Sequence, residues 1–215
     1  KMKYETEVHW DYSNTVTIMI EQIKENSTVL EFGPASGRLT RYLKEKKNCS
    51  VYIVEIDPEA GAIAAQYAAG SYIGDIEKFE WIKAFEGLSF DYILFADVLE
   101  HLRDADFVLK QTYPFLKEGG HILVSLPHVC HNSVIIDMLH NKFQYQETGL
   151  LDNTHLKLWT EESADDLFRR NGFYILTKDA TYTQVGFNEF HNSYQSLQKE
   201  WAAALKNRPM GEVYQ

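Results

Sequence analysis

The sequence is short of cysteine, of long apolar runs and of positive charge, and each shortage disfavours a class of protein. Two cysteines in 215 residues, Cys49 and Cys130, cannot make a disulfide framework, which favours a reducing, cytoplasmic compartment. No apolar run approaches the roughly 20 residues that a membrane-spanning helix needs, so we expect no membrane span. Residues 1–10 contain no apolar segment of the kind found in secretory signals, and we expect no such signal.

The shortage of basic residues bears on the choice of partner. The chain has 21 Lys and Arg against 31 Asp and Glu, which gives a net charge of −10. Because an acidic surface repels phosphate backbones, this balance disfavours a nucleic-acid partner. Repeats and Pro/Gly-rich linkers are also lacking, and 45% apolar residues predict one soluble domain over residues 1–215, of undetermined oligomeric state.

Apolar runs that alternate with helical patterns predict an α/β fold. Such an alternation implies an open, mostly parallel sheet with right-handed crossovers. The predicted strands are 27–32, 49–56, 72–73, 90–96, 121–126 and 173–183, with the opening of one more at 213–214. The predicted helices are 14–24, 36–46, 58–69, 79–85, 105–116, 133–140, 161–170 and 187–206.

One long segment breaks this rhythm. Residues 128–159 are rich in His, Asn and aromatic residues, and long irregular insertions of this kind are usually functional. We therefore predict a lid, or acceptor-binding insertion, at 128–159.

Thr160 then caps a helix, but Ser163 stands where a capping box needs Glu or Gln, so we expect only half of that motif. Upstream, Gly119–Gly120 is expected to stop the helix that begins at residue 105.

The stretch from Val29 to Gly37 predicts a strand, a tight turn and the start of a helix. Its apolar run contains an acid, Glu31, and is followed by two glycines four residues apart, Gly33 and Gly37. Such a turn lets a nucleotide-like ligand approach the backbone with no side chain in the way. A dinucleotide site would need a third glycine where Arg38 stands, which argues against NAD or FAD. An ordinary strand-to-helix turn is the alternative for this stretch alone.

Unusual residues also follow the next predicted strands. Glu55 and Asp57 close the second strand, and Asp75, Asp97 and His128 come just after the third, fourth and fifth. In a parallel sheet ligands bind at the carboxyl ends of the strands, so this succession predicts a binding site there. A carboxylate can accept two hydrogen bonds from a cis-diol, which suits Glu55, whereas Asp57 is better placed to cap the next helix.

These motifs resemble those of the class I S-adenosylmethionine-dependent methyltransferases, from about Val29 to about Ile175. The resemblance implies a Rossmann-like fold with helices on both faces of a mostly parallel seven-stranded sheet. In a bacterial subgroup of this family the last strand has a Tyr-Gln step near its start, so a match at Tyr214–Gln215 implies a last strand that is cut short. Ala35 departs from the family pattern, which usually has glycine there. The resemblance implies S-adenosylmethionine as cofactor and S-adenosylhomocysteine as product. The residues implied to bind the cofactor are Glu31, Phe32, Gly33, Pro34, Ala35, Ser36, Gly37, Glu55, Ile56, Asp75, Ile76, Asp97 and Val98.

The same resemblance implies a role for each strand end. Glu55 would bind both ribose hydroxyls, Asp75 would accept from the adenine amine, and Ile76 would pack on the adenine ring. The stretch 90–102 would line the methionine end of the cofactor and face the acceptor.

A narrower resemblance concerns the acceptor. The segments 126–128, 143–145, 149–152, 154–156 and 159–160 are similar to a bacterial subgroup often linked to polysaccharide or cell-surface glycan pathways. This similarity implies O-methylation of a sugar, a glycan or another small hydroxylated acceptor. A base should then take the hydroxyl proton, and we expect His155 first, His128 second and Asp97 third. A structural histidine that fixes the lid is the alternative for His155.

A metal site is a second interpretation of the same residues. Asp97, Glu100, His101 and His155 resemble the metal site of 2′-O-methyltransferases that act on small-RNA ends. Carboxylate and imidazole ligands together would suit Mn²⁺, Fe²⁺ or Zn²⁺ better than Mg²⁺. The first acid is Asp rather than Glu and the chain is acidic, and both points weigh against this site.

Two further interpretations stay open. The chain could be a cofactor-binding module without catalysis, or an NAD-dependent reductase, although a Tyr-x-x-x-Lys pair near a serine is lacking. Trp10 and Tyr12 could cover the cofactor or pack against the first helix. The remaining histidines show no ligand spacing, and we assign no role to His9, His121, His131, His140 and His191.

Overall fold

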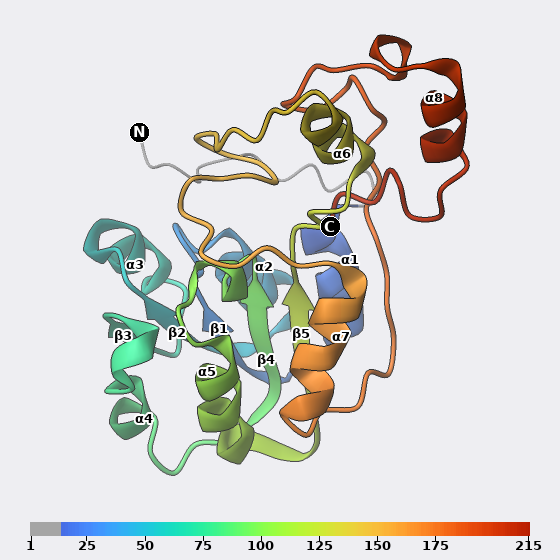
Figure 1. The fold of residues 1–215 in the computed structure, drawn as a ribbon. Helices are drawn as coiled ribbons and strands as arrows, with labels where there is room; N and C mark the ends of the chain where they lie inside the picture. The colour runs from blue at the N-terminus through green and yellow to red at the C-terminus, as the bar shows by residue number, and fades with distance from the viewer. Residues whose placement is uncertain (1–13) are drawn as a thin grey trace. The chain divides into compact units, whose positions relative to one another are not determined.

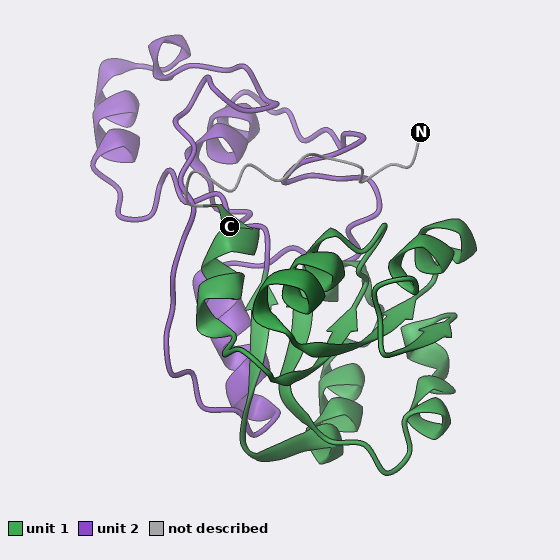
Figure 2. Cartoon of the chain, turned by 180° about the vertical axis from the view of Figure 1, so that it is seen from behind, with its two compact units in different colours: residues 1–125 green, residues 126–215 purple. Residues whose placement is uncertain are grey.

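The computed structural model describes residues 14–215 (Figure 1), so the roles considered for Trp10 and Tyr12 lie outside the described residues. The chain divides into two compact units, residues 1–125 and residues 126–215 (Figure 2). Within residues 14–215, every helix is too short or too polar to cross a membrane. Both cysteines, Cys49 and Cys130, are free thiols. The single domain and the cytoplasmic location stay predictions.

Unit 1 is built on a parallel sheet (Figure 1). Among residues 14–125 its five strands are β1 (Thr28–Phe32), β2 (Ser50–Glu55), β3 (Gly70–Ile73), β4 (Phe90–Ala96) and β5 (Leu116–Ser125). The order across the sheet is β3-β2-β1-β4-β5, so β1 lies between β2 and β4 and the strand order reverses there. The expected parallel α/β sheet is confirmed, and in sheets of this topology ligands bind beyond the carboxyl ends of the strands next to such a reversal, here β1, β2 and β4.

Helices cover both faces of this sheet, which explains why its strands are almost continuously apolar. On one face α1 (Thr15–Gln22), α2 (Arg38–Lys47) and α3 (Pro58–Ala64) close an apolar cluster that includes Ile23, Leu43 and Ile53. On the other face lie α4 (Trp81–Ala84) and α5 (Ala105–Thr112). There the ring of Phe32 stacks on Phe95 at 4.9 Å and meets Trp81 edge-on at 5.1 Å. The part of the unit that the structure describes also has three single turns: η1 (Ile76–Lys78), η2 (Leu99–His101) and η3 (Tyr113–Phe115).

The start of β5 corrects two expectations. The helix predicted to reach residue 116 ends at Thr112, because Pro114 has no N–H to continue it, and the turn η3 follows. Gly119–Gly120 does not stop a helix but lies inside β5, which begins at Leu116 rather than at residue 121. Between two paired rungs, Asp91 alone stands opposite the four residues 117–120, and Gly119 has a φ of +72°. The glycines therefore form a bulge.

Unit 2 has no regular strand among its described residues. Its helices are α6 (Asn132–Leu139), α7 (Glu161–Arg170) and α8 (Lys199–Lys206), with the single turn η4 (Tyr194–Ser196). Val134, Leu150 and Leu151 form a small apolar core. A helix is therefore confirmed within the predicted lid, beginning one residue earlier than expected.

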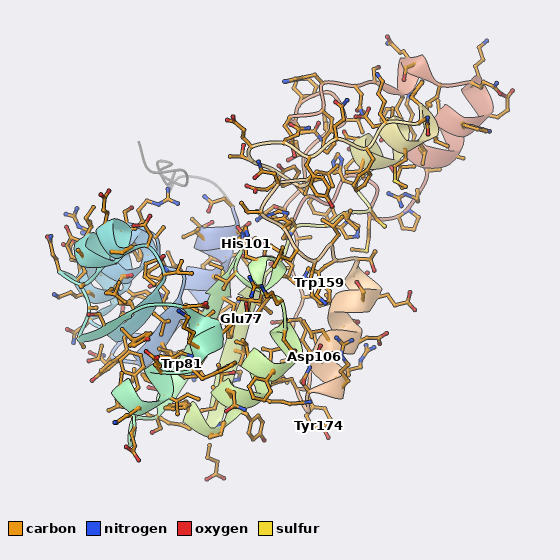
Figure 3. The ribbon with its side chains drawn as sticks, turned by 60° about the vertical axis from the view of Figure 1, so that its left-hand side comes forward. Glu77, Trp81, His101, Asp106, Trp159 and Tyr174 are labelled. Carbon is orange, nitrogen blue, oxygen red and sulfur yellow. The ribbon has the colours of Figure 1, made fainter. Side chains whose placement is uncertain are left out.

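The strand predicted at 173–183 does not form. Only its end is paired: Tyr182 makes an isolated antiparallel bridge with Val213, and the N–H groups of Thr181 and Thr183 donate to the carbonyls of Gln215 and Glu212 at 3.0 Å. Tyr174, whose side chain is 92% exposed, lies in an extended segment without strand pairing (Figure 3). The sheet within residues 14–215 therefore has five strands, and the expected sixth and seventh are not present in it.

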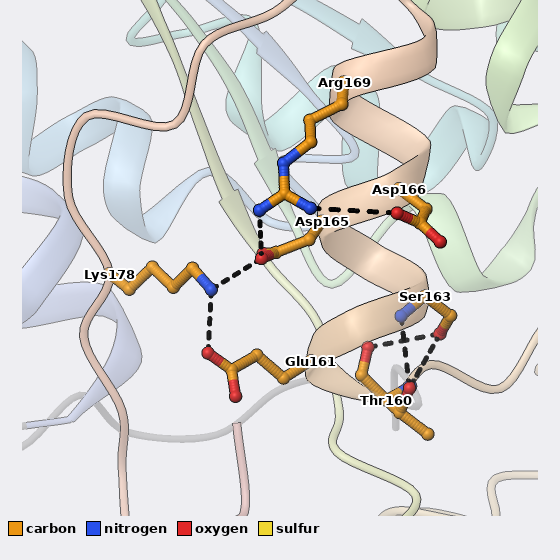
Figure 4. A network of polar contacts seen from close by, with 7 residues as sticks. All are labelled: Thr160, Glu161, Ser163, Asp165, Asp166, Arg169 and Lys178. Carbon is orange, nitrogen blue, oxygen red and sulfur yellow. Dashed lines mark hydrogen bonds and ion pairs between the residues drawn. The ribbon is translucent and has the colours of Figure 1, made fainter.

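Side chains replace strand pairing in this region (Figure 4). Lys178 makes ion pairs of 2.7 Å with Glu161 and Asp165, which fasten its segment to α7. At the start of α7, Thr160 Oγ1 accepts from the N–H of Ser163 at 3.2 Å, and Ser163 Oγ accepts from the N–H of Thr160 at 2.9 Å. The expectation of half a capping box is wrong, because the serine hydroxyl takes the place of a glutamate.

The helix predicted at 187–206 forms only as η4 and α8. His191 has a φ of +48°, which a right-handed helix cannot contain. Asn188 and Asn192 hydrogen-bond to Ser133 on α6, at 2.9 Å and 2.7 Å. Amide side chains that compete for hydrogen bonds in this way disfavour a helix.

Candidate active site

The turn between β1 and α2 has a left-handed backbone at three positions. Gly33, Ala35 and Gly37 have φ values of +66°, +50° and +79°. A Cβ on Gly33 would lie 2.8 Å from Cγ2 of Val98, and one on Gly37 would lie 2.6 Å from Cα of Ala64. Both glycines are therefore required by conformation and by close approach. Gly33 is exposed, so the backbone at this turn is accessible to a ligand.

Glu55, at the end of β2, joins this turn to the next one. Its Oε2 accepts a hydrogen bond of 2.8 Å from the N–H of Ala35, and its Oε1 accepts one of 2.9 Å from the N–H of Asp57. Each carboxylate oxygen can accept a second hydrogen bond, so Glu55 can also bind a cis-diol. Ile56 beside it is 66% exposed, which leaves an apolar side chain at the same strand end. Asp57 caps α3, as expected.

Glu31 is a buried carboxyl on the α2 side of β1. It is 2% exposed, and Thr40 Oγ1 donates a hydrogen bond of 2.6 Å to its Oε2. Burial raises the pKa of Glu31 from 4.5 to about 7, the Thr40 hydrogen bond lowers it, and the charge of Glu55 raises it further. The side chain of Phe32 lies in the core, so any contact of that residue with a ligand must come from its backbone.

The residues after β3 hold the next turn. Asp75 Oδ1 accepts a hydrogen bond of 2.9 Å from the N–H of Glu77 and so caps η1. Trp81 Nε1 donates a hydrogen bond of 2.9 Å to the carbonyl of Ile76 (Trp81 and Glu77 are labelled in Figure 3). The N–H of Gly74 donates to the carbonyl of Glu55 at 2.7 Å. This bond ties the turn to the end of β2. The adenine-binding role of Asp75 and Ile76 stays a prediction.

Asp97 follows β4 with a φ of +55° and is exposed. Ser125 Oγ donates a hydrogen bond of 2.8 Å to Asp97 Oδ1 and accepts one of 3.0 Å from the N–H of Asp97. The turn η2 then carries Glu100, which is fully buried, and His101, which is partly exposed (Figure 3). Metal binding by these residues stays a prediction.

The two histidines proposed as bases belong to unit 2. His155 is partly exposed, and its Nδ1 lies 3.2 Å from the carbonyl oxygen of Leu150. A carbonyl can only accept, so Nδ1 carries the proton and the basic lone pair is on Nε2. His128 is 9% exposed, and burial lowers its pKa. The backbone N–H of His128 donates to the backbone carbonyl of Tyr214 at 2.9 Å.

Sequence reasoning missed three contributors to this arrangement. Thr40 binds Glu31 from α2, Ser125 binds Asp97 from β5, and a Cβ on Gly61 would lie 3.3 Å from Cβ and Cγ of Glu55. Nothing in the local sequence distinguishes these residues, because each acts across the fold.

A surface hollow of about 590 Å³ lies elsewhere in unit 1 and contains none of the predicted site residues. It is lined by Phe79, Ile82, Lys83, Glu86, Gly87, Leu88, Pro114 and Phe115.

The residues at these strand ends fit S-adenosylmethionine. Glu31 and Glu55 are buried carboxyls close enough for their charges to interact, and they lie next to an accessible glycine backbone. Negative charge of this kind suits a ligand with a sulfonium and an ammonium group, whereas it would repel the pyrophosphate of a dinucleotide. Hydrogen-bond acceptors on Glu55 suit a ribose diol.

Comparison with known proteins identifies the class. Residues 5–178 match the family described as "Methyltransferase domain". Over 120 residues the chain is 28% identical to (S)-tetrahydroprotoberberine N-methyltransferase of Eschscholzia californica, and the match spans 52% of this chain and about a third (32%) of that protein.

Solved structures support the same fold. A methyltransferase dependent on S-adenosylmethionine from Archaeoglobus fulgidus has a TM-score of 0.65 at 16% identity, over 93% of this chain and 87% of that one. A Thermotoga maritima methyltransferase, described as a possible histamine N-methyltransferase, has a TM-score of 0.56 at 20% identity, over 75% and 70% of the two chains.

The chain belongs to the methyltransferase-domain family, because the family match covers well over half of it. Its fold is that of the class I methyltransferases that depend on S-adenosylmethionine. The expected enzyme class and cofactor are thereby confirmed at the level of the family.

Proposed function

We propose that the chain binds S-adenosylmethionine at the carboxyl ends of β1, β2 and β4 and transfers its methyl group to a hydroxyl of a small acceptor. The observation that carries this proposal is the double bridge made by Glu55, whose two oxygens accept from the N–H groups of Ala35 and Asp57. One carboxylate thus ties the turns after β1 and β2 to each other, which supports a single ligand site at both.

Each part of the cofactor has a group suited to it. Glu55 takes the ribose hydroxyls, Asp75 and Ile76 take the adenine, and the exposed backbone at Gly33 allows close approach. Glu31 supplies a carboxyl near the cationic methionine end. The cofactor, when bound, supplies a methyl group already activated on a sulfonium. The protein must therefore orient the acceptor, exclude water and accept a proton.

His155 is the proposed base for a hydroxyl acceptor. The hydrogen bond from Nδ1 to the carbonyl of Leu150 fixes the neutral tautomer and directs basicity to Nε2. His128 is the second candidate, since its lowered pKa keeps it neutral at physiological pH. Asp97 is the third, and its exposed carboxylate follows β4.

The acceptor class rests on the segments in 126–160 that resemble a glycan-linked subgroup, and we propose a sugar or glycan hydroxyl. An amine is the second candidate, because the curated relative named above is an N-methyltransferase. A neutral amine needs no base for the transfer itself, so this candidate predicts that His155 is dispensable for chemistry. The two candidates are therefore separable by one substitution.

Calorimetry with S-adenosylhomocysteine tests the cofactor site. Wild type should bind, and Glu55→Gln should bind at least about tenfold more weakly, because an amide cannot accept on both sides. Glu59→Gln is the matched control, since Glu59 is exposed on α3. No heat of binding to folded wild type would overturn the proposal.

A transfer assay tests the acceptor. Methyl-labelled S-adenosylmethionine is offered with panels of mono- and oligosaccharides and of amines, with and without a chelator. Label on a sugar oxygen supports the first candidate, and label on nitrogen supports the second. Loss of transfer after chelation and dialysis, restored by Mn²⁺ or Zn²⁺, would instead support the metal interpretation.

A further inference from the structure

The end of β5 reaches across to the turn after β4 through a single side chain. Ala96 and Ser125 are the last paired residues of the β4–β5 ladder. Main-chain pairing between the two strands stops there, and Pro127 follows two residues later. The hydroxyl of Ser125, a residue that is 7% exposed, accepts from the next N–H instead, that of Asp97, at 3.0 Å. It thereby extends the ladder by one rung, which uses a side chain as acceptor.

The same hydroxyl also fixes the side chain of Asp97. It donates to Oδ1 at 2.8 Å, so Ser125 holds both the backbone and the carboxylate of Asp97. Asp97 needs such support, because its φ of +55° is unfavourable for a residue with a Cβ, although Asp tolerates it better than most. Two bonds from one partner therefore stabilise this conformation of the turn.

This turn also places the next residue. Val98 follows Asp97, and its Cγ2 occupies the space that a Cβ on Gly33 would need, at 2.8 Å. Ser125, Asp97, Val98 and Gly33 therefore form a continuous line of contact from β5 through the end of β4 to the turn after β1. All four residues belong to unit 1.

We infer that Ser125 is a positioning residue for the cofactor site, which holds the Asp97 carboxylate and the Val98 side chain in place beside Gly33. This role rests on the proposed function, because it assigns the line of contact to the methionine end of S-adenosylmethionine. Ser125 itself touches no ligand in this role, and it acts through Asp97.

Calorimetry with S-adenosylhomocysteine on the full chain tests this role. Ser125→Ala removes both hydrogen bonds and should weaken binding about tenfold, the ratio expected for their combined loss. Ser125→Thr retains the hydroxyl and should bind within about twofold of wild type. Ser50→Ala is the matched control, because Ser50 is exposed at the opposite end of a strand and should leave binding unchanged.

A double-mutant cycle separates positioning from general stability. Asp97→Gly removes the carboxylate and relieves the backbone but keeps the N–H from which Ser125 Oγ accepts, so Ser125→Ala should cost clearly less affinity in the Asp97→Gly background than in wild type. Affinities are measured well below the melting temperature of each variant, as followed by circular dichroism. If Ser125→Ala does not fold, Ser125→Cys takes its place in the cycle. Cysteine has a similar volume to serine, but its thiol is only a weak hydrogen-bonding group.

The outcomes are distinct. If folded Ser125→Ala binds as wild type does, or weakens binding equally in both backgrounds, the positioning role is overturned while the proposed function stands. If folded wild type does not bind S-adenosylhomocysteine, the proposed function is overturned and this role with it. If Ser125→Ala weakens binding, Ser125→Thr restores it and the loss is smaller in the Asp97→Gly background, both the positioning role and the proposed function are supported.

Discussion

Thr40 on α2 donates a 2.6 Å hydrogen bond to Oε2 of Glu31 on β1, and both side chains are buried. Burial dominates the titration of this carboxyl and raises its pKa to about 7, although the Thr40 bond favours the charged form. Glu31 therefore changes charge near neutral pH, at the strand end where a cationic ligand is proposed to bind.

Glu31 should make the stability of the fold depend on pH. Its pKa is about 7 in the folded chain against an ordinary value of 4.5, so the folded state binds the proton more tightly than the unfolded state does. As the pH rises from about 4.5 to about 7, the free energy of unfolding should therefore fall, by roughly 3 kcal/mol at most, and then level off. Urea titrations at pH 5 to 8 measure this fall. Glu31→Gln should abolish it, whereas Glu45→Gln, an exposed control on α2, should retain it.

Ala35→Gly should stabilise the protein. Ala35 has a φ of +50°, which costs an L-residue with a Cβ about 1 kcal/mol or more, while glycine adopts it freely. The N–H that binds Glu55 belongs to the backbone and is kept. A gain of about 1 kcal/mol in urea denaturation is expected. Ala69→Gly, in an exposed loop with an ordinary φ, should instead lose stability, and equal effects at the two positions would contradict the strain at Ala35.

Unit 2 should loosen on acidification because His131 is buried in the neutral form. Its Nε2–H donates to the carbonyl of Thr183 at 2.7 Å, and its Nδ1 accepts from the N–H of Ser133 at 3.0 Å. Burial lowers the pKa of His131, although the bond to Thr183 opposes this. Stability from this group is therefore complete above about pH 6.5 and is lost as the pH falls below it.

Hydrogen exchange of residues 126–215 between pH 8 and pH 5, corrected for intrinsic rates, measures this loosening. Wild type should lose protection as the pH falls. His131→Gln should be less protected at pH 8 and show a smaller further loss, whereas His191→Gln, at an exposed position, should behave as wild type. An unchanged pH response in His131→Gln would assign the effect to other groups, of which His128 is the first.

His155→Ala should separate chemistry from binding. If His155 is the base for a hydroxyl acceptor, kcat should fall about a hundredfold or more, while the Kd for S-adenosylhomocysteine stays within about twofold of wild type. Equal losses in kcat and in cofactor affinity would indicate a structural role for its bond to Leu150. His191→Ala provides the control, since that histidine is exposed in the same unit.

The sequence predicts unit 1 well because its signals are local. β4 has the predicted limits, Asp57 caps α3 as expected, and Gly33 and Gly37 have the positive φ that their turn requires. The contacts that complete the site are not local. Ser125 meets Asp97 across 28 positions of sequence, and no periodicity or spacing reports such a pairing.

Unit 2 is predicted less well for a related physical reason. The segment 173–183 has the composition of a strand, but a strand exists only where a partner offers hydrogen bonds, and here Lys178 is held by carboxylates on α7 instead. The Asn188 and Asn192 amides find their partner, Ser133, more than fifty residues away, so the helix expected at 187–206 is interrupted. The roles of His128 and His155 stay predictions.

The bulge at residues 117–120 has a consequence for tolerance to insertions. Beyond it, residues 121–125 of β5 pair rung by rung with residues 92–96 of β4. Side chains alternate between the two faces of a strand, so one residue added between His121 and Ser125 would turn the serine hydroxyl away from Asp97. One residue added inside the bulge would be absorbed there, because its backbone already departs from the ladder. Length variation at the two ends of the same strand therefore has opposite effects: harmless at the glycines, and disabling a few positions later.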